Sequence, residues 1–165
     1  MDNNPAPGNK KGGLTTILEK SLGAVAKGGN SVLQDVLNYA EPLKNKGFNF
    51  MDSPGYDPVS VTGQVASGAN VICFTTGRGS CFGCKPVPSL KLSTNTAMYE
   101  KMSEDMDINC GTIAEGKEKI EEVGQKIFDL VVNTASGNKS KSEINGYGDE
   151  AVSYTHLTLP TMFVV

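Results

Sequence analysis

Histidine and arginine are nearly absent from this chain of 165 residues, in which His156 and Arg78 are the only examples. A catalytic arrangement built on a histidine base would therefore have to recruit His156, close to the end of the chain. No apolar run approaches the roughly 20 residues that a membrane-spanning helix needs. With 15 basic and 18 acidic side chains, the net charge of −3 lacks the positive surface that nucleic-acid binding requires. We therefore expect no nucleic-acid partner and no membrane association.

Cysteine is also sparse, with four residues, and the chain does not open on the basic and apolar leader of a secreted protein. Free thiols without such a leader are typical of a reducing compartment, so we expect a cytoplasmic protein. Cys81 and Cys84 form a Cys-x-x-Cys pair, whose alternatives are a redox pair or half of a zinc site.

Helix and strand signals alternate along the chain. Thr16 and Glu19 fit a capping box, which predicts a helix that ends at Gly28. The unbroken apolar run Val71–Phe74 predicts a strand buried on both faces. Similar patterns predict strands at 48–51 and 90–92 and helices over 96–104 and 120–131. Helices interleaved with buried strands indicate an α/β fold, Rossmann-like in layering, with a mainly parallel sheet flanked by helices.

A further helix is predicted to begin at Asp57 and to end near Gly68. Asp57 is expected as the N-cap and Pro58 as the first helical residue, because aspartate and proline are favoured at these positions.

The last residues differ from the rest of the chain. Residues 153–161 show no periodicity linked to the preceding pattern and resemble the translated read-through of a sequencing adapter. We therefore expect one domain over residues 1–150 and a non-native tail over residues 151–165, and we exclude His156 from the functional argument. A genuine edge strand is the alternative.

Arg78 lies in the segment Thr75–Gly79, directly after the apolar run that predicts a strand. In open α/β sheets, ligands bind beyond the carboxyl ends of the strands. Two hydroxyls, one guanidinium and glycine-exposed N–H groups suit a small polyhydroxy acid or a phosphate. The segment thus predicts an anion site, the alternative being an arginine that ties down loop carbonyls.

Carboxylates and an amide gather in residues 104–109. Asp107 and Asn109 alternate around Ile108, so both could point to one side of an extended segment. Their oxygens are hard ligands that suit magnesium, manganese or ferrous iron. These residues are candidate metal ligands, and the alternative is a solvated helix end, which is the usual explanation of a cluster of charges.

Five motifs occur in a fixed order, namely Pro7–Asn9, Gly12–Thr16, Glu19–Gly23, Phe74–Gly79 and Asp107–Gly111. As a set they resemble the carboxy-terminal part of the altronate/galactarate (sugar-acid) dehydratase family. The resemblance covers about residues 4–148, and the loop Gly79–Pro88 looks closer to altronate than to galactarate dehydratases.

The resemblance implies a hydro-lyase that dehydrates D-altronate, or a related hexonate or hexarate, to a 2-keto-3-deoxy sugar acid in hexuronate catabolism. It also implies a divalent metal, Fe2+ or Mn2+, whose ligands would lie mostly in an amino-terminal part ahead of this region. On this view the chain is a fragment, inactive alone. Its partners would be the sugar acid, the missing upstream domains of the same enzyme and further copies in a homo-oligomer.

The same resemblance assigns roles to individual residues. Arg78 would grip the substrate carboxylate, and Lys20 is a candidate base if burial lowers its pKa, a helix-surface lysine being the alternative. Asp107 and Asn109 would contact the metal or the sugar chain. The substrate-binding residues would be Thr75, Thr76, Arg78, Gly79 and Asn9.

Two interpretations from other classes compete with this one. A non-catalytic domain could bind carboxylate or phosphate through the Arg78 loop alone. A redox or zinc module could instead be built on Cys81 and Cys84.

Overall fold

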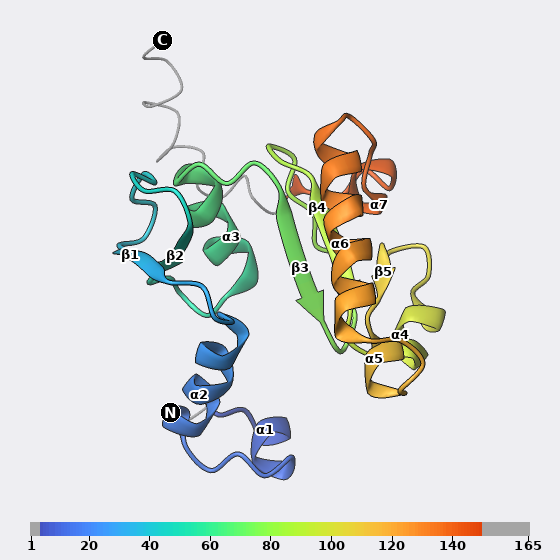
Figure 1. Ribbon diagram of the computed structural model, residues 1–165, viewed down its shortest axis with the longest axis horizontal. Helices are drawn as coiled ribbons and strands as arrows, with labels where there is room; N and C mark the ends of the chain where they lie inside the picture. The colour runs from blue at the N-terminus through green and yellow to red at the C-terminus, as the bar shows by residue number, and fades with distance from the viewer. Residues whose placement is uncertain (1–3, 150–165) are drawn as a thin grey trace. The chain divides into compact units, whose positions relative to one another are not determined.

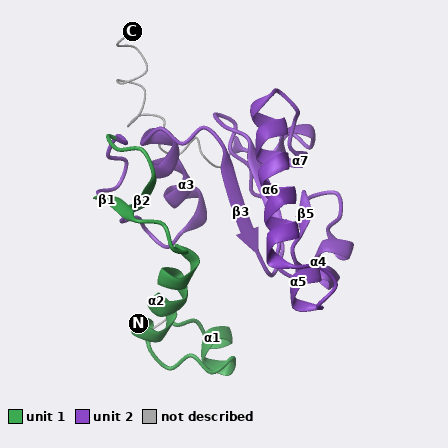
Figure 2. Cartoon of the chain, in the orientation of Figure 1, with its two compact units in different colours: residues 1–36, 44–50 green, residues 37–43, 51–165 purple. Residues whose placement is uncertain are grey.

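The computed structural model describes residues 4–149, whose helices and strands are drawn in Figure 1. Its packing divides the chain into two compact units, shown in Figure 2. Unit 1 comprises residues 1–36 and 44–50, and unit 2 comprises residues 37–43 and 51–165. Each unit is described by itself. The predicted tail, residues 151–165, lies outside the described residues, so it and the domain boundary at residue 150 stay predictions.

Unit 1 contains two helices and most of two strands. They are α1 (Pro7–Lys11), α2 (Ile17–Lys27), β1 (Leu33–Leu37) and β2 (Phe48–Met51), and the two strands pair with each other. The predicted capping box of α2 is confirmed. The Thr16 hydroxyl accepts a hydrogen bond from the Glu19 N–H at 3.2 Å, and the Glu19 carboxylate accepts one from the Thr16 N–H.

Unit 2 carries a three-stranded sheet in the order β3-β4-β5, with both strand pairs parallel. Its elements are α3 (Asp57–Ala66), β3 (Ile72–Thr76), β4 (Ser89–Ser93), α4 (Thr96–Lys101), β5 (Ile108–Asn109), α5 (Gly111–Ala114), α6 (Ile120–Ala135) and α7 (Lys141–Ile144). Parallel strands with intervening helices confirm the predicted α/β class, whereas the Rossmann-like layering stays a prediction. None of the helices within residues 4–149 has the length and apolarity needed to span a bilayer.

The predicted strand at 71–74 forms as β3, but the prediction that it is buried on both faces is wrong. Cys73 and Thr75 are exposed, because β3 lies at the edge of the three described strands. The middle strand β4 is the one buried throughout, from Ser89 to Ser93. Burial on both faces therefore follows from the place of a strand in the sheet, which the apolar run alone does not encode.

Polar side chains take part in the interior around β4. Lys91 is fully buried, and its Nζ lies 5.1 Å from the centre of the Tyr147 ring, a cation–π distance. The Ser142 hydroxyl donates to the Ser89 carbonyl at 2.8 Å and so ties α7 to the strand.

Two helix ends differ from prediction. The N-cap of α3 is Tyr56, which makes no side-chain capping bond, so Asp57 is the first helical residue and not the cap. Helix α4 begins after Asn95, whose side-chain oxygen accepts from the Met98 N–H at 2.9 Å, and it ends at Lys101 and not at residue 104. Both differences are small in length, but the first changes where the Asp57 carboxylate points.

Candidate functional site

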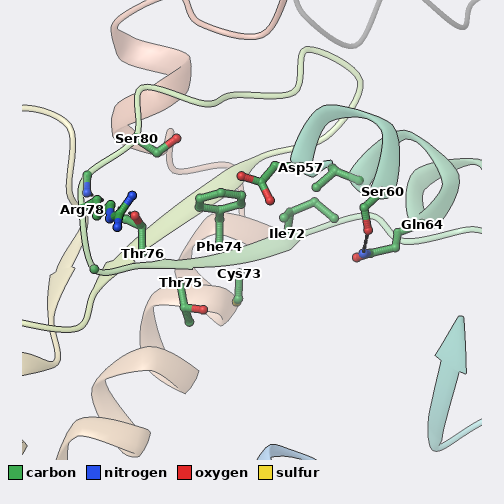
Figure 3. Close-up of a pocket in the computed structure, with 13 residues that line it drawn as sticks. Asp57, Ser60, Gln64, Ile72, Cys73, Phe74, Thr75, Thr76, Arg78 and Ser80 are labelled. Atoms are coloured by element: carbon green, nitrogen blue, oxygen red, sulfur yellow. Dashed lines mark hydrogen bonds between the residues drawn. The ribbon is translucent and has the colours of Figure 1, made fainter. Parts of the chain in front are cut away.

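A cavity of about 630 Å3 lies in unit 2 between α3 and the carboxyl end of β3, as Figure 3 shows. Its lining includes Arg78 and the glycines on either side of it, which follow β3 in the chain. This is the edge of a parallel sheet at which ligands bind in open α/β folds. The predicted place of the anion site is therefore a cavity.

The pleat of β3 separates the two threonines that were predicted to bind substrate together. Phe74 and Thr76 lie on one face of the strand, while Cys73 and Thr75 lie on the other (Figure 3). Successive side chains of a strand alternate in this way. Both threonines line the cavity, but from opposite faces of β3, so their hydroxyls do not converge on one point.

The loop after β3 is held from β4 and from the start of α4. The Thr94 N–H donates to the Thr76 carbonyl at 3.0 Å, and the Asn95 amide donates to the Gly77 carbonyl at 2.8 Å. Gly79 has a φ of +96°, and a Cβ there would lie 2.1 Å from the Met102 sulfur. Only glycine fits this turn, which presents the Gly79 N–H to the Thr76 hydroxyl at 3.2 Å.

Arg78 lines the cavity with an exposed side chain. Within residues 4–149 its guanidinium has no recorded hydrogen bond or ion pair. The alternative of an arginine that ties down loop carbonyls therefore finds no support. A guanidinium without internal partners can receive a carboxylate through two parallel hydrogen bonds.

Lys20 and Asn9, two further predicted site residues, lie together in unit 1. The Lys20 ammonium donates to the Asn9 side-chain oxygen at 3.1 Å and to that of Asn4 at 3.0 Å. Lys20 is exposed, so the burial on which its prediction as a base depends is missing. Its catalytic role stays a prediction, and the contacts seen are those of a surface lysine.

Asp107 and Asn109 are half-buried, and hydrogen bonds within the chain occupy both side chains. The Asp107 carboxylate accepts from the Lys91 N–H at 2.7 Å and, with its other oxygen, from the Lys141 N–H at 3.0 Å. The Asn109 oxygen accepts from the Gly111 N–H at 2.9 Å. These bonds join β4, β5 and α7.

These residues do not fit the predicted metal as they stand. Carboxylate oxygens that face backbone N–H groups are turned toward donors and away from a cation. In the part of the chain that the structure describes, no three Asp, Glu, His or Cys side chains gather as a metal ion would need. The Fe2+ or Mn2+ site therefore stays a prediction that these residues do not support.

The paired cysteines differ in their surroundings. Cys84 is buried in a cluster with Val61, Ile72 and Phe82, and this burial raises the pKa of its thiol. Cys81 is exposed, and neither residue is in a disulfide. The buried thiol behaves as a small core side chain, so the pair does not present two thiols to one ligand.

Sequence reasoning missed three polar side chains of α3 that line the cavity: Asp57, Ser60 and Gln64. The Ser60 hydroxyl shares a hydrogen bond with that of Ser53 at 2.8 Å and accepts one from the Gln64 amide at 3.2 Å. Their spacing of three and four places them on one helix face, which was a usable signal. The pattern is hard to recognise because aspartate before proline is also a favoured N-cap.

Comparison with known proteins identifies related sequences. The family described as D-galactarate/altronate dehydratase, C-terminal, matches residues 1–158. The chain is 47% identical over 136 residues to galactarate dehydratase (L-threo-forming) of Escherichia coli strain K12, covering 82% of this chain. It is 39% identical over 156 residues to altronate dehydratase of Bacillus subtilis strain 168, covering 94% of it.

A relative with a different activity also matches. The beta subunit of (2R)-sulfolactate sulfo-lyase from Chromohalobacter salexigens is 34% identical over 147 residues, or 88% of this chain. The matched regions make up 26% of the galactarate dehydratase, 31% of the altronate dehydratase and 38% of the sulfo-lyase subunit. The chain thus spans only about a quarter to two fifths of the length of these relatives.

Proposed function

Because the chain belongs to the D-galactarate/altronate dehydratase C-terminal family, we propose that it contributes the carboxylate-binding part of a hydro-lyase active site. The substrate is a sugar acid, D-altronate or a related hexonate or hexarate. The product is the corresponding 2-keto-3-deoxy acid. The observation that carries the proposal is Arg78, which is exposed at the cavity wall and has no hydrogen-bond or ion-pair partner among residues 4–149.

The names of the relatives support the choice of Arg78. Galactarate, altronate and sulfolactate differ in length and in the group that is lost, but each has a carboxylate beside a carbon that carries a hydroxyl. A domain shared by enzymes for all three is expected to recognise what the substrates have in common. A guanidinium matches a carboxylate with two parallel hydrogen bonds, so Arg78 would bind this shared end.

Binding of this kind also serves the chemistry. Removal of the proton beside a carboxylate builds negative charge on the carboxylate oxygens, which a positive group held at that place stabilises. Thr76 lines the cavity on the face of β3 that carries Phe74, and its hydroxyl can hydrogen-bond a hydroxyl of the sugar acid.

We further propose that the domain works joined to other parts of a longer enzyme. The two dehydratases are about three times as long as this chain, and unit 1 leaves large apolar side chains such as Leu18, Leu22 and Val25 exposed. Exposed apolar side chains gathered on one helix are typical of a surface that another domain covers. Alone, the chain is then expected to bind its substrate but to turn it over poorly.

Two measurements test this function. Calorimetric titration of the chain with altronate and galactarate measures binding, with a neutral hexitol as the control that lacks a carboxylate. Arg78→Lys should weaken binding of the acids by about 10-fold or more, since a charge-assisted pair is worth roughly 1.5–3 kcal/mol. Turnover is measured as keto-acid formation by the chain joined to the amino-terminal part of the B. subtilis altronate dehydratase.

The outcomes separate three possibilities. Keto-acid formation that Arg78→Lys abolishes supports the proposed hydro-lyase. Binding of acids without any turnover in the joined protein favours a non-catalytic carboxylate-binding domain. Equal binding of the acids by the wild type and by Arg78→Lys contradicts the assignment of the cavity.

A further inference from the structure

Asp57 lies in the wall of the Arg78 cavity, in the first turn of α3, where a negative charge also suits the helix N-terminus. It is the first residue of α3, and Tyr56 occupies the capping position in its place. Within residues 4–149 its carboxylate has no recorded hydrogen bond or ion pair, and the residue is exposed. A carboxylate that neither caps its helix nor pairs with a cation is available to a ligand in the cavity.

Figure 3 places this carboxylate relative to the anion site. Asp57 and Arg78 lie on the face of β3 that carries Phe74, with the Phe74 ring between them. Ser60, one turn along α3, faces the same cavity, and its hydroxyl is held by Ser53. The cavity therefore has the positive charge of Arg78 at one end, the apolar ring of Phe74 in the middle, and the Asp57 carboxylate and the Ser60 hydroxyl on α3.

Of the described residues that line this cavity, Asp57 is the only one with a carboxylate. Cys73 is the other group of the lining that could take up a proton, but it lies on the face of β3 opposite Phe74. Proton abstraction beside a carboxylate needs a basic group within reach of that carbon. In this cavity Asp57 meets that need.

We infer that Asp57 is the base that removes the proton from C2 of the sugar acid whose carboxylate Arg78 binds, an assignment that rests on the proposed function. The C2–H electron pair first passes into an enediolate formed with the bound carboxylate, and this pair then becomes the C2=C3 double bond as the C3–O bond breaks. Asp57 passes the proton to the departing hydroxide, which leaves as water, so the carboxylate is regenerated. The resulting enol tautomerises to the 2-keto-3-deoxy acid, and no oxidant or reductant is consumed.

The test uses the chain joined to the amino-terminal part of the B. subtilis altronate dehydratase, with altronate and galactarate as substrates. Asp57→Asn keeps the size of the side chain and removes its basicity. We expect kcat to fall by about 10²–10⁴-fold, the usual contribution of a general base, while the affinity for the acids changes only a few-fold. In deuterated water, exchange at C2 should fall in parallel with turnover.

Asp129→Asn is the matched control, because it makes the same change on the exposed surface of α6, where Asp129 meets only the Gln125 side chain. It should leave kcat and binding unchanged. Asp57→Glu should recover part of the activity, since it restores a carboxylate at a shifted position.

Each outcome decides between the two proposals. If the wild type turns over and Asp57→Asn keeps its kcat and its C2 exchange, the assignment of the base is wrong and the proposed function stands. If Asp57→Asn loses binding as Arg78→Lys does, Asp57 is a binding or structural residue and not the base. If the wild type neither turns over the acids nor exchanges the C2 proton, the proposed function is wrong, and so is the assignment of Asp57 as the base.

Discussion

The two units treat the same residue types in opposite ways. In unit 1, helix α2 has no buried residue, and Leu18 and Val25 are 73% and 75% exposed. In unit 2, strand β4 has no exposed residue, and Leu90 is 0% exposed. Short helices are marginal without tertiary packing, so α2 depends on its local caps, whereas β4 depends on what surrounds it. Local capping signals therefore stabilise helix α2 of unit 1, whereas burial in the core stabilises strand β4 of unit 2.

A pair of leucine substitutions tests this contrast most strongly. Leu90→Ala removes a fully buried side chain from the middle strand and should lower the free energy of unfolding by about 2–5 kcal/mol. Leu18→Ala makes the same change on the exposed face of α2 and should cost less than about 0.5 kcal/mol. Urea unfolding of the chain followed by circular dichroism measures both. Equal losses would show that the leucine on α2 is as well packed as the one in the sheet.

Asp107→Asn tests the interior of unit 2 through its polar contacts. The change replaces one of two accepting oxygens by an amide that would face the N–H of Lys91 or of Lys141. Leaving one of these half-buried donors unsatisfied should lower the free energy of unfolding by about 1–3 kcal/mol. Urea unfolding measures the loss, with Asp129→Asn on exposed α6 as the control that should change little.

The same variant addresses the predicted metal contact. If the carboxylate is structural, titration with Mn2+ should give the same binding for Asp107→Asn as for the wild type. Unchanged stability combined with lost Mn2+ binding would instead restore Asp107 as a ligand.

The elements of the fold could be predicted from sequence where their signals are local. The capping box at Thr16 and Glu19, and the Asn95 cap of α4, are short patterns whose partners lie within three or four residues. The burial of β3 could not be predicted in the same way. An apolar run indicates that a strand is at least partly buried. Whether that strand lies at the edge or in the middle of the sheet depends on which strands pair with it.

The residues of the candidate site show the same difference between local signals and contacts made by distant parts of the chain. The Arg78 loop was predictable, because glycines and hydroxyls after a strand indicate a ligand site without further context. The residues of α3 in the cavity wall were not predicted. Aspartate before proline is also the usual start of a helix, and sequence alone does not tell whether Asp57 is the N-cap or, one position later, the first helical residue. Asp107 and Asn109 are the opposite case, because they were predicted to contact a metal and the structure does not support this. Their residue types suit a metal, but their neighbours in space are backbone N–H groups.

The smallest expected effect concerns the caps of α2 in unit 1. The Glu19 carboxylate accepts hydrogen bonds from the Thr15 hydroxyl and N–H, both at 2.7 Å, and these bonds, the hydroxyl first, lower the pKa of Glu19. A carboxylate with a lowered pKa in the folded state stabilises it above the unfolded value of 4.5, and this contribution is lost as the pH falls through the lowered pKa. Hydrogen exchange of the α2 amides should therefore accelerate, relative to intrinsic rates, when the pH is lowered from about 6 to 3.

Thr16→Ala should weaken the same helix by about 1 kcal/mol at neutral pH, because it removes the hydroxyl that accepts from the Glu19 N–H. Ser21→Ala is the matched control, since its hydroxyl bonds only to the Ile17 carbonyl inside the helix and satisfies no free N–H group. If α2 is held by its caps, exchange of its amides responds to Thr16→Ala and to pH but hardly to Ser21→Ala, and the amides of β4 respond to none of the three. If the α2 amides ignore both Thr16→Ala and pH, tertiary contacts hold this helix, and the contrast between local signals in unit 1 and burial in unit 2 is wrong.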